Sequence, residues 1–160
     1  MRRLLLAVLL CAGLVGVGAT PAAASARVAA DGTFTVAVTG APALQPLPGG
    51  RCLATLPVTL GFAGTLEGTA PGTIRVAVDA ACDVAFAVPP GTYADAFLFT
   101  GTFTGTVAGE EAGARLVYSG VTRAGGQVRG LMALHGDAHG LLRVEASAGA
   151  GGTYRGSVRA

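Results

Sequence analysis

The chain has 160 residues, of which 51% are hydrophobic and 12% charged, and its formal net charge at pH 7 is +2. Two of its eleven basic residues stand at positions 2 and 3, so residues 27–160 are close to neutral, with their arginines scattered. A near-neutral chain without a basic patch lacks the electrostatic footprint of a nucleic-acid-binding protein, and we exclude that class of function.

The first segment predicts an export signal. Arg2 and Arg3 precede an uncharged apolar run over residues 4–19, and small residues occupy positions 24–26. These are the three parts of a signal peptide. We expect residues 1–26 to be a Sec-type signal peptide, cleaved after Ala26 or alternatively after Ala24. Residues 27–160 then form one domain of a protein secreted to the periplasm or extracellular space, without a membrane-spanning segment of its own.

The rest of the chain repeats its apolar residues with a period of two, which is typical of strands with one buried face. In chain order we expect strands within Phe34–Val38, Leu56–Leu66, Ile74–Val78, Cys82–Val88, Phe97–Val107, Leu116–Tyr118, Val128–Leu134, Leu142–Ala146 and Tyr154–Val158. Turn signals separate them at Pro46–Gly50, Pro71–Gly72, Pro89–Gly91, Ala124–Gly126 and Gly149–Gly152. No stretch has the apolar spacing of a helix over three turns, so the fold class is all-β.

Glycines inside the predicted strands favour a closed sheet. Glycine within a strand weakens it and usually marks a bulge or a sharp bend, which a barrel needs in order to close. Such glycines stand at positions 61, 64, 101, 105, 120, 130 and 156. We therefore predict a single antiparallel β-barrel of about eight strands, with a β-sandwich as the alternative.

Two of the three cysteines fall in the predicted mature domain. Cys11 lies in the leader, where the bulky Leu10 before it disfavours lipidation. Cys52 and Cys82 are an even pair in an exported domain, and they lack the Cys-x-x-Cys spacing of a redox site. We predict a structural disulfide between them, which stabilises the fold by about 3–4 kcal/mol on the chain-entropy model.

Two stretches resemble a bacterial family of unknown function. Residues 62–68 read F-A-G-T-L-E-G, similar to the family's F-x-G-x-[IL]-x-G segment, and a glycine-broken hairpin follows from Gly105 to about Val144. The family is one of the domain-of-unknown-function groups that share the allene-oxide-cyclase-like barrel, akin to lipocalins and dirigent proteins. The resemblance implies an eight-stranded barrel with an apolar lumen and no known reaction. The first strand lacks an acid, so the plant cyclase's catalytic glutamate has no counterpart there.

One cluster, His135-x-Asp137-x-His139, contains residue types that commonly bind metal ions. Alternate residues of a strand share a face, so these side chains are weak candidates for a metal site. Glycines flank the cluster where a hairpin turn is expected, and solvated turn residues are the preferred interpretation. We expect no metal and no cofactor.

Four residues are candidates to line a ligand cavity. Phe97, Phe99 and Phe103 form an aromatic row on one strand face, although such a row is more often core. Glu67 has the opposite parity to Leu56–Leu66, so it faces the lumen only if that apolar row packs outward. No nucleophile motif is present, and we assign no catalytic residue.

Three functions remain open. The first is a barrel that binds a small apolar molecule in its lumen. The second is a structural or interaction protein of the cell envelope. The third is a cyclase- or isomerase-like enzyme, which requires a titratable side chain beside a cavity. The sequence leaves the oligomeric state and the ligand undetermined.

Overall fold

The computed structural model describes residues 26–159, so the predicted signal peptide and its cleavage sites lie almost entirely outside the described residues. The strands are β1 (Val28–Val38), β2 (Ala43–Leu47), β3 (Arg51–Gly64), β4 (Leu66–Val78), β5 (Asp95–Val107), β6 (Glu110–Thr122), β7 (Gln127–Gly136), β8 (His139–Ser147) and β9 (Gly151–Arg159). A single helical turn, α1 (Cys82–Ala85), stands between β4 and β5. The all-β prediction is confirmed.

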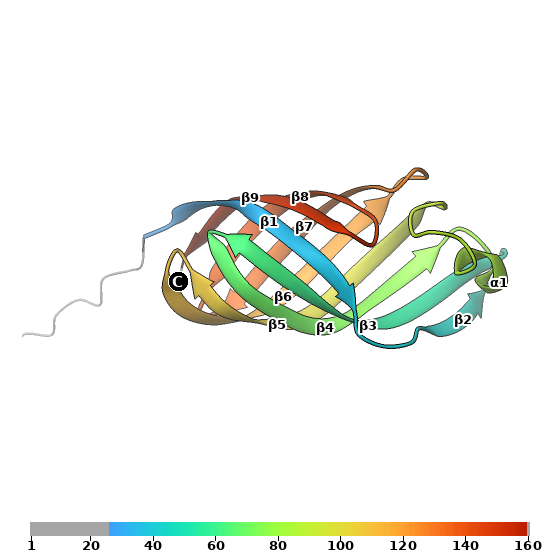
Figure 1. Ribbon diagram of the computed structural model, residues 1–160, viewed down its shortest axis with the longest axis horizontal. Coiled ribbons are helices and arrows are strands. Elements are labelled where there is room, and N and C mark those ends of the chain that lie inside the picture. The colour runs from blue at the N-terminus through green and yellow to red at the C-terminus, as the bar shows by residue number, and fades with distance from the viewer. Residues whose placement is uncertain (1–25, 160) are drawn as a thin grey trace, which may run out of the picture.

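The sheet closes into a barrel of eight antiparallel strands with β2 as an extra strand (Figure 1). Neighbouring strands pair in the order β1-β9-β8-β7-β6-β5-β4-β3, and β1 pairs with β3 to close the circle. One edge of β3 is shared, because residues 58–64 pair with β1 whereas residues 51–55 pair with β2. The β2 strand therefore extends the wall at one end only, beside α1.

The two ends of the barrel differ in their connections. At one end, which we call the closed end, tight turns join β3 to β4, β5 to β6 and β7 to β8. At the other end, which we call the mouth, β5 begins at Asp95 and residues 86–94 cross from α1 to that strand. We call residues 86–94 the strap. Short turns join β6 to β7 and β8 to β9 at the mouth.

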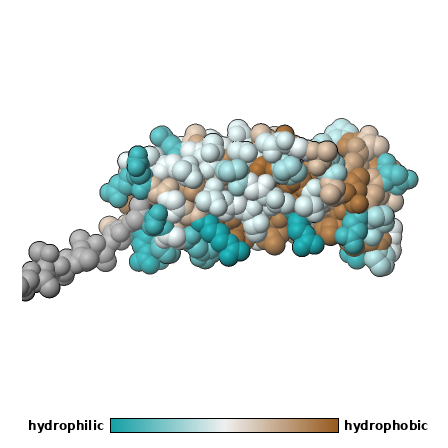
Figure 2. Space-filling model, turned by 90° about the horizontal axis from the view of Figure 1, so that it is seen from below, coloured by the Kyte–Doolittle hydropathy of each residue, from teal (hydrophilic) through white to brown (hydrophobic). Residues whose placement is uncertain are grey.

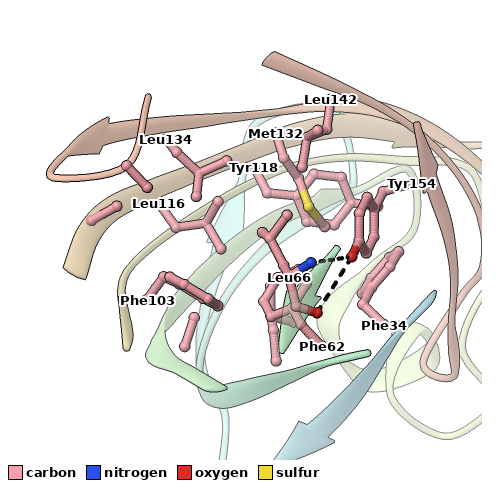
Figure 3. Close-up of a cluster of buried hydrophobic side chains, with 14 of the residues drawn as sticks. Phe34, Phe62, Leu66, Phe103, Leu116, Tyr118, Met132, Leu134, Leu142 and Tyr154 are labelled. Carbon is pink, nitrogen blue, oxygen red and sulfur yellow. Dashed lines mark hydrogen bonds between the residues drawn. The ribbon is translucent and has the colours of Figure 1, made fainter. Parts of the chain in front are cut away.

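The core fills the closed end. Side chains of alternate residues from facing strands interdigitate there (Figure 3), and Leu66, Phe103 and Leu116 are fully buried. Tyr154 is also fully buried, and its hydroxyl accepts a hydrogen bond from the Leu66 N–H at 2.9 Å. The carbonyl oxygens of Ala63 and Leu66 lie 3.3 and 3.4 Å from the same hydroxyl, which can donate to them. Tyr154 thus ties the β3–β4 turn to β9.

Two local features explain how the strands curve. Gly105 has a φ of +157° and faces Gly68 on β4; a Cβ there would stand 2.0 Å from the Glu67 carbonyl oxygen. Only glycine fits such a close approach. Pro71 has no N–H to donate, and the β4–β5 pairing is interrupted between Thr69 and Gly72. These breaks bend the long strands around the barrel.

Several element predictions were wrong in detail. Cys82–Val88 is α1 and part of the strap rather than a strand, because the disulfide fixes Cys82 against β3 and two prolines follow at positions 89 and 90. Pro71–Gly72 lies inside β4 rather than in a turn. Leu66 belongs to β4, beyond the turn that ends β3, and the pairing of residues 43–47 with β3 was not predicted.

The predicted disulfide is confirmed. Cys52 and Cys82 are bonded, with their Cα atoms 4.8 Å apart. The bond joins the start of β3 to α1, immediately before the strap. Within residues 26–159, none of the helical structure is long and apolar enough to cross a bilayer.

Candidate functional site

A cavity of about 330 Å³ opens at the mouth of the barrel. Its floor is formed by Phe34, Val58, Phe97 and Tyr118, at the level where the packed core begins. Its walls come from inward-facing residues of the strands, and its roof comes from the strap. The wall residues include Val36, Val38, Leu56, Ile74, Val76, Val78, Asp95, Thr122, Val128 and Ala146. The volume lies at the lower end of the range that is typical of small-molecule sites.

The floor of the cavity is aromatic. The Tyr118 ring meets Phe97 edge-on at a centroid distance of 4.8 Å and Phe34 at 5.7 Å. Phe34 in turn stacks on Phe62 of the core at 6.2 Å. Such pairs fix ring orientations, so the floor offers a rigid apolar surface to whatever enters the lumen.

The strap is held at both sides of the mouth. On one side the disulfide fixes α1 to β3. On the other, the Gly125 N–H of the β6–β7 turn donates to the Gly91 carbonyl oxygen at 3.0 Å. The apolar side chains of the strap are only partly buried, and Phe86, which lines the cavity, is 40% exposed. Hydrophobic surface gathers at this right-hand end of the molecule (Figure 2).

One carboxyl group lies in the wall of the cavity. Asp95 begins β5 and pairs with Thr122 of β6, whose hydroxyl is hydrogen-bonded to the carboxyl group. The Oδ1 atom is shielded from solvent and has no hydrogen-bond partner among the described residues. Burial raises the pKa of Asp95, and the Thr122 bond offsets this in part. Burial and then the Asp95 charge raise the pKa of Tyr118.

The four residues considered as candidates to line a cavity lie in three different environments. Phe97 lines the cavity. Phe99 and Phe103 are fully buried in the core below it and do not line the cavity. Glu67 is exposed on the outer face, because the neighbouring Leu66 points inward and residues of opposite parity point outward. The condition for a lumenal Glu67 is therefore not met.

The His135, Asp137 and His139 side chains are all exposed around the β7–β8 turn. The turn is held by its backbone, since the Asp137 N–H donates to the Gly113 carbonyl oxygen at 3.0 Å. Within residues 26–159, no group of three or more His, Cys, Asp or Glu side chains is placed to hold a metal ion.

Sequence reasoning missed Asp95, Thr122 and Tyr118 as a group. The alternation of residues along β5 could have identified the acid. Asp95 has the same odd parity as Phe97 and Phe99, which face inward, so its side chain was predictable as inward-facing. That Thr122 and Tyr118 lie beside it depends on the β5–β6 register, which pairs Asp95 with Thr122 and Phe99 with Tyr118.

Comparison with known proteins defines the fold and leaves the function open. No protein-family model and no curated protein sequence matches the chain significantly. Among solved structures, the chain is similar to a protein of unknown function from the DUF3224 family of Shewanella oneidensis MR-1, with a TM-score of 0.60 and 19% sequence identity. The match covers 83% of this chain and 96% of that chain. At this identity the likeness shows the fold alone, and it agrees with the expectation of an uncharacterised barrel.

Proposed function

We propose that this protein is an exported β-barrel that binds a small, predominantly apolar molecule in the cavity at its mouth. The observation that carries the proposal is the cavity itself: about 330 Å³ of space, walled by aliphatic side chains and floored by aromatic rings, at one end of a barrel whose other end is packed. A concave apolar site with few polar groups is the usual form of a small-molecule site.

Two further observations support the proposal. The strap exposes apolar side chains at the entrance, where a ligand would cover them. The disulfide supports the export part, because disulfides persist in oxidising compartments and are rare in the cytosol. Export also rests on the leader sequence of residues 1–26.

The direct test is calorimetric titration of the mature protein with a panel of lipids, terpenes and phenols. Ala146 lines the cavity from β8, so Ala146→Phe should fill the space and abolish saturable binding. Ala37 is exposed on β1, and Ala37→Phe is the matched control that should bind as the wild type does. Absence of saturable binding in the wild type, or equal binding by both variants, would refute the proposal.

A cyclase- or isomerase-like activity is the second candidate, and Asp95 is the observation that favours it. The allene-oxide-cyclase resemblance required a titratable side chain beside a cavity, and Asp95 lies in the cavity wall with a raised pKa. Chromatography and NMR spectroscopy of the molecule recovered after incubation separate the two functions, because an isomer has the same mass as its substrate. A binding protein returns it unchanged, whereas an enzyme returns an isomer.

A further inference from the structure

Among the described residues, the ionisable groups that line the cavity are acidic, and none of them is a cation. The polar side chains among its lining residues are Thr92, Tyr93, Asp95, Tyr118, Thr122 and Ser147. Asp95 is the one carboxyl group in this set, and the described lining contains no arginine or histidine. An anionic ligand head would therefore meet a carboxylate and no compensating cation.

Asp95 has unused capacity to accept hydrogen bonds. A carboxylate offers about four acceptor positions, and the described residues supply the Thr122 hydroxyl to one of them. Its Oδ1 atom is buried without a partner. Buried polar atoms without a partner are uncommon in folded proteins and call for an explanation, and an unfilled acceptor in the wall of an apolar cavity is explained by a ligand that donates to it.

We propose that the ligand carries a hydrogen-bond-donating head, an ammonium or a hydroxyl group, that pairs with Asp95, while its apolar body lies on the floor formed by Phe34, Phe97 and Tyr118. This inference rests on the proposed binding function and adds the ligand's chemical class. It predicts discrimination against carboxylates, so long-chain fatty acids in their ionised form are poor ligands.

The fold also orients the ligand. Asp95 is the first residue of β5 and lies across from Val78 at the end of β4, so the head is held at the level of the strap. Phe97 is the next inward-facing residue of β5, and Phe99 below it is fully buried. The apolar body therefore has about one layer of side chains to cross before it reaches the packed core, which favours short or compact molecules.

The test compares three probes with one apolar body: octylammonium, 1-octanol and octanoate, titrated calorimetrically into the mature protein at neutral pH. Octylammonium should bind at least about ten-fold more tightly than octanoate, the ratio expected for one hydrogen bond to a charged group. In Asp95→Asn the ratio should fall to about three or less. Asp79 is exposed at the end of β4 and does not line the cavity, so Asp79→Asn removes the same charge as a matched control and should keep the ratio.

Each outcome decides between the two proposals. If all three probes bind with equal affinity, or if Asp95→Asn keeps the wild-type ratio, the inference about the head group is wrong and binding in the lumen stands. If none of the probes binds, both proposals are wrong. Circular dichroism checks that Asp95→Asn is folded, and Asp95→Leu provides a second variant, which should lose octylammonium binding and weaken that of 1-octanol by a smaller factor.

Discussion

The two ends of this barrel are built from the same strands and are packed differently. At the closed end Phe103, Leu116 and Leu134 are almost completely buried, and Tyr154 adds hydrogen bonds to the β3–β4 turn. At the mouth the inward-facing residues border a cavity, Phe86 and Val38 are 40% and 58% exposed, and a carboxyl group lies in the wall. One end is close-packed, and the other encloses the cavity in which we propose that a ligand binds.

The difference shows how a small barrel can hold a cavity and remain folded. A hollow region forgoes van der Waals contacts, which lowers stability. The closed end, the continuous ladder of strand pairs and the disulfide beside the mouth offset that loss. Substitutions at the two ends should therefore have unequal effects on the free energy of unfolding.

The largest expected effect is at the closed end. Phe103→Ala should lower the free energy of unfolding by about 3–5 kcal/mol, because it opens a void in close-packed core. Phe97→Ala should cost less than half as much, because the Phe97 ring already borders open space. Urea denaturation of both variants gives the comparison. Equal losses would contradict the contrast between the two ends.

Removal of the disulfide should have the next largest effect. Replacing both Cys52 and Cys82 with alanine should lower stability by about 2–4 kcal/mol. It should also free one side of the strap, so hydrogen exchange of the Gly125 N–H, which bonds to Gly91, should accelerate more than that of the Leu66 N–H. Uniform acceleration at both sites would show that the disulfide acts on the whole barrel rather than on the mouth.

Tyr154→Phe tests the hydrogen bonds of the closed end. The variant keeps the ring and leaves the buried Leu66 N–H without its partner, so we expect a loss of about 1–2 kcal/mol. Thermal denaturation measures it, with Tyr93→Phe at the strap as the control. A loss no greater than that of the control would show that the Tyr154 hydroxyl is not needed.

The smallest expected change in the free energy of unfolding is at Asp95, where substitution should stabilise the protein rather than destabilise it. Burial raises its folded-state pKa above the ordinary 3.8, so the folded protein binds the proton more tightly than the unfolded chain. Stability from this group is therefore present at low pH and is lost as the pH rises through the raised pKa. Asp95→Asn, which cannot ionise, should therefore be more stable than the wild type at neutral pH.

The pH series supplies the control for this prediction. The advantage of Asp95→Asn in melting temperature should shrink as the pH falls from neutral through the raised pKa towards 3.8. A wild type that is the more stable protein at neutral pH would show that Asp95 contributes to stability rather than reducing it.

The strands and their closure were predictable because their causes are local. The alternation of Phe34, Val36 and Val38 predicts a half-buried strand, and glycines such as Gly105 mark the bends that close the sheet. The pairing of Cys52 with Cys82 followed from their number and the predicted compartment. Pro71–Gly72 misled because a proline–glycine pair is a turn signal in isolation, whereas here it bends a strand.

The site was less predictable because it is assembled across strands. Phe97 and Phe99 have the same parity and differ in depth, and depth depends on where the core ends rather than on the alternation. The alternation places Asp95 on the inward face. That Asp95 lies beside Thr122 and under the strap, in the wall of a cavity, depends on the tertiary structure. Glu67 attracted attention through a sequence resemblance, although its parity already favoured the outer face.

Binding in the cavity at the mouth is best tested by a ¹H–¹⁵N correlation spectrum of the mature protein recorded during titration with 1-octanol. We expect saturable shifts at backbone amides around the cavity, including Val58, Phe97 and Val128, whereas the amide signals of Phe103 and Leu134 at the closed end should not move. Shifts confined to the outer face of the barrel, or the absence of saturable shifts, would contradict it.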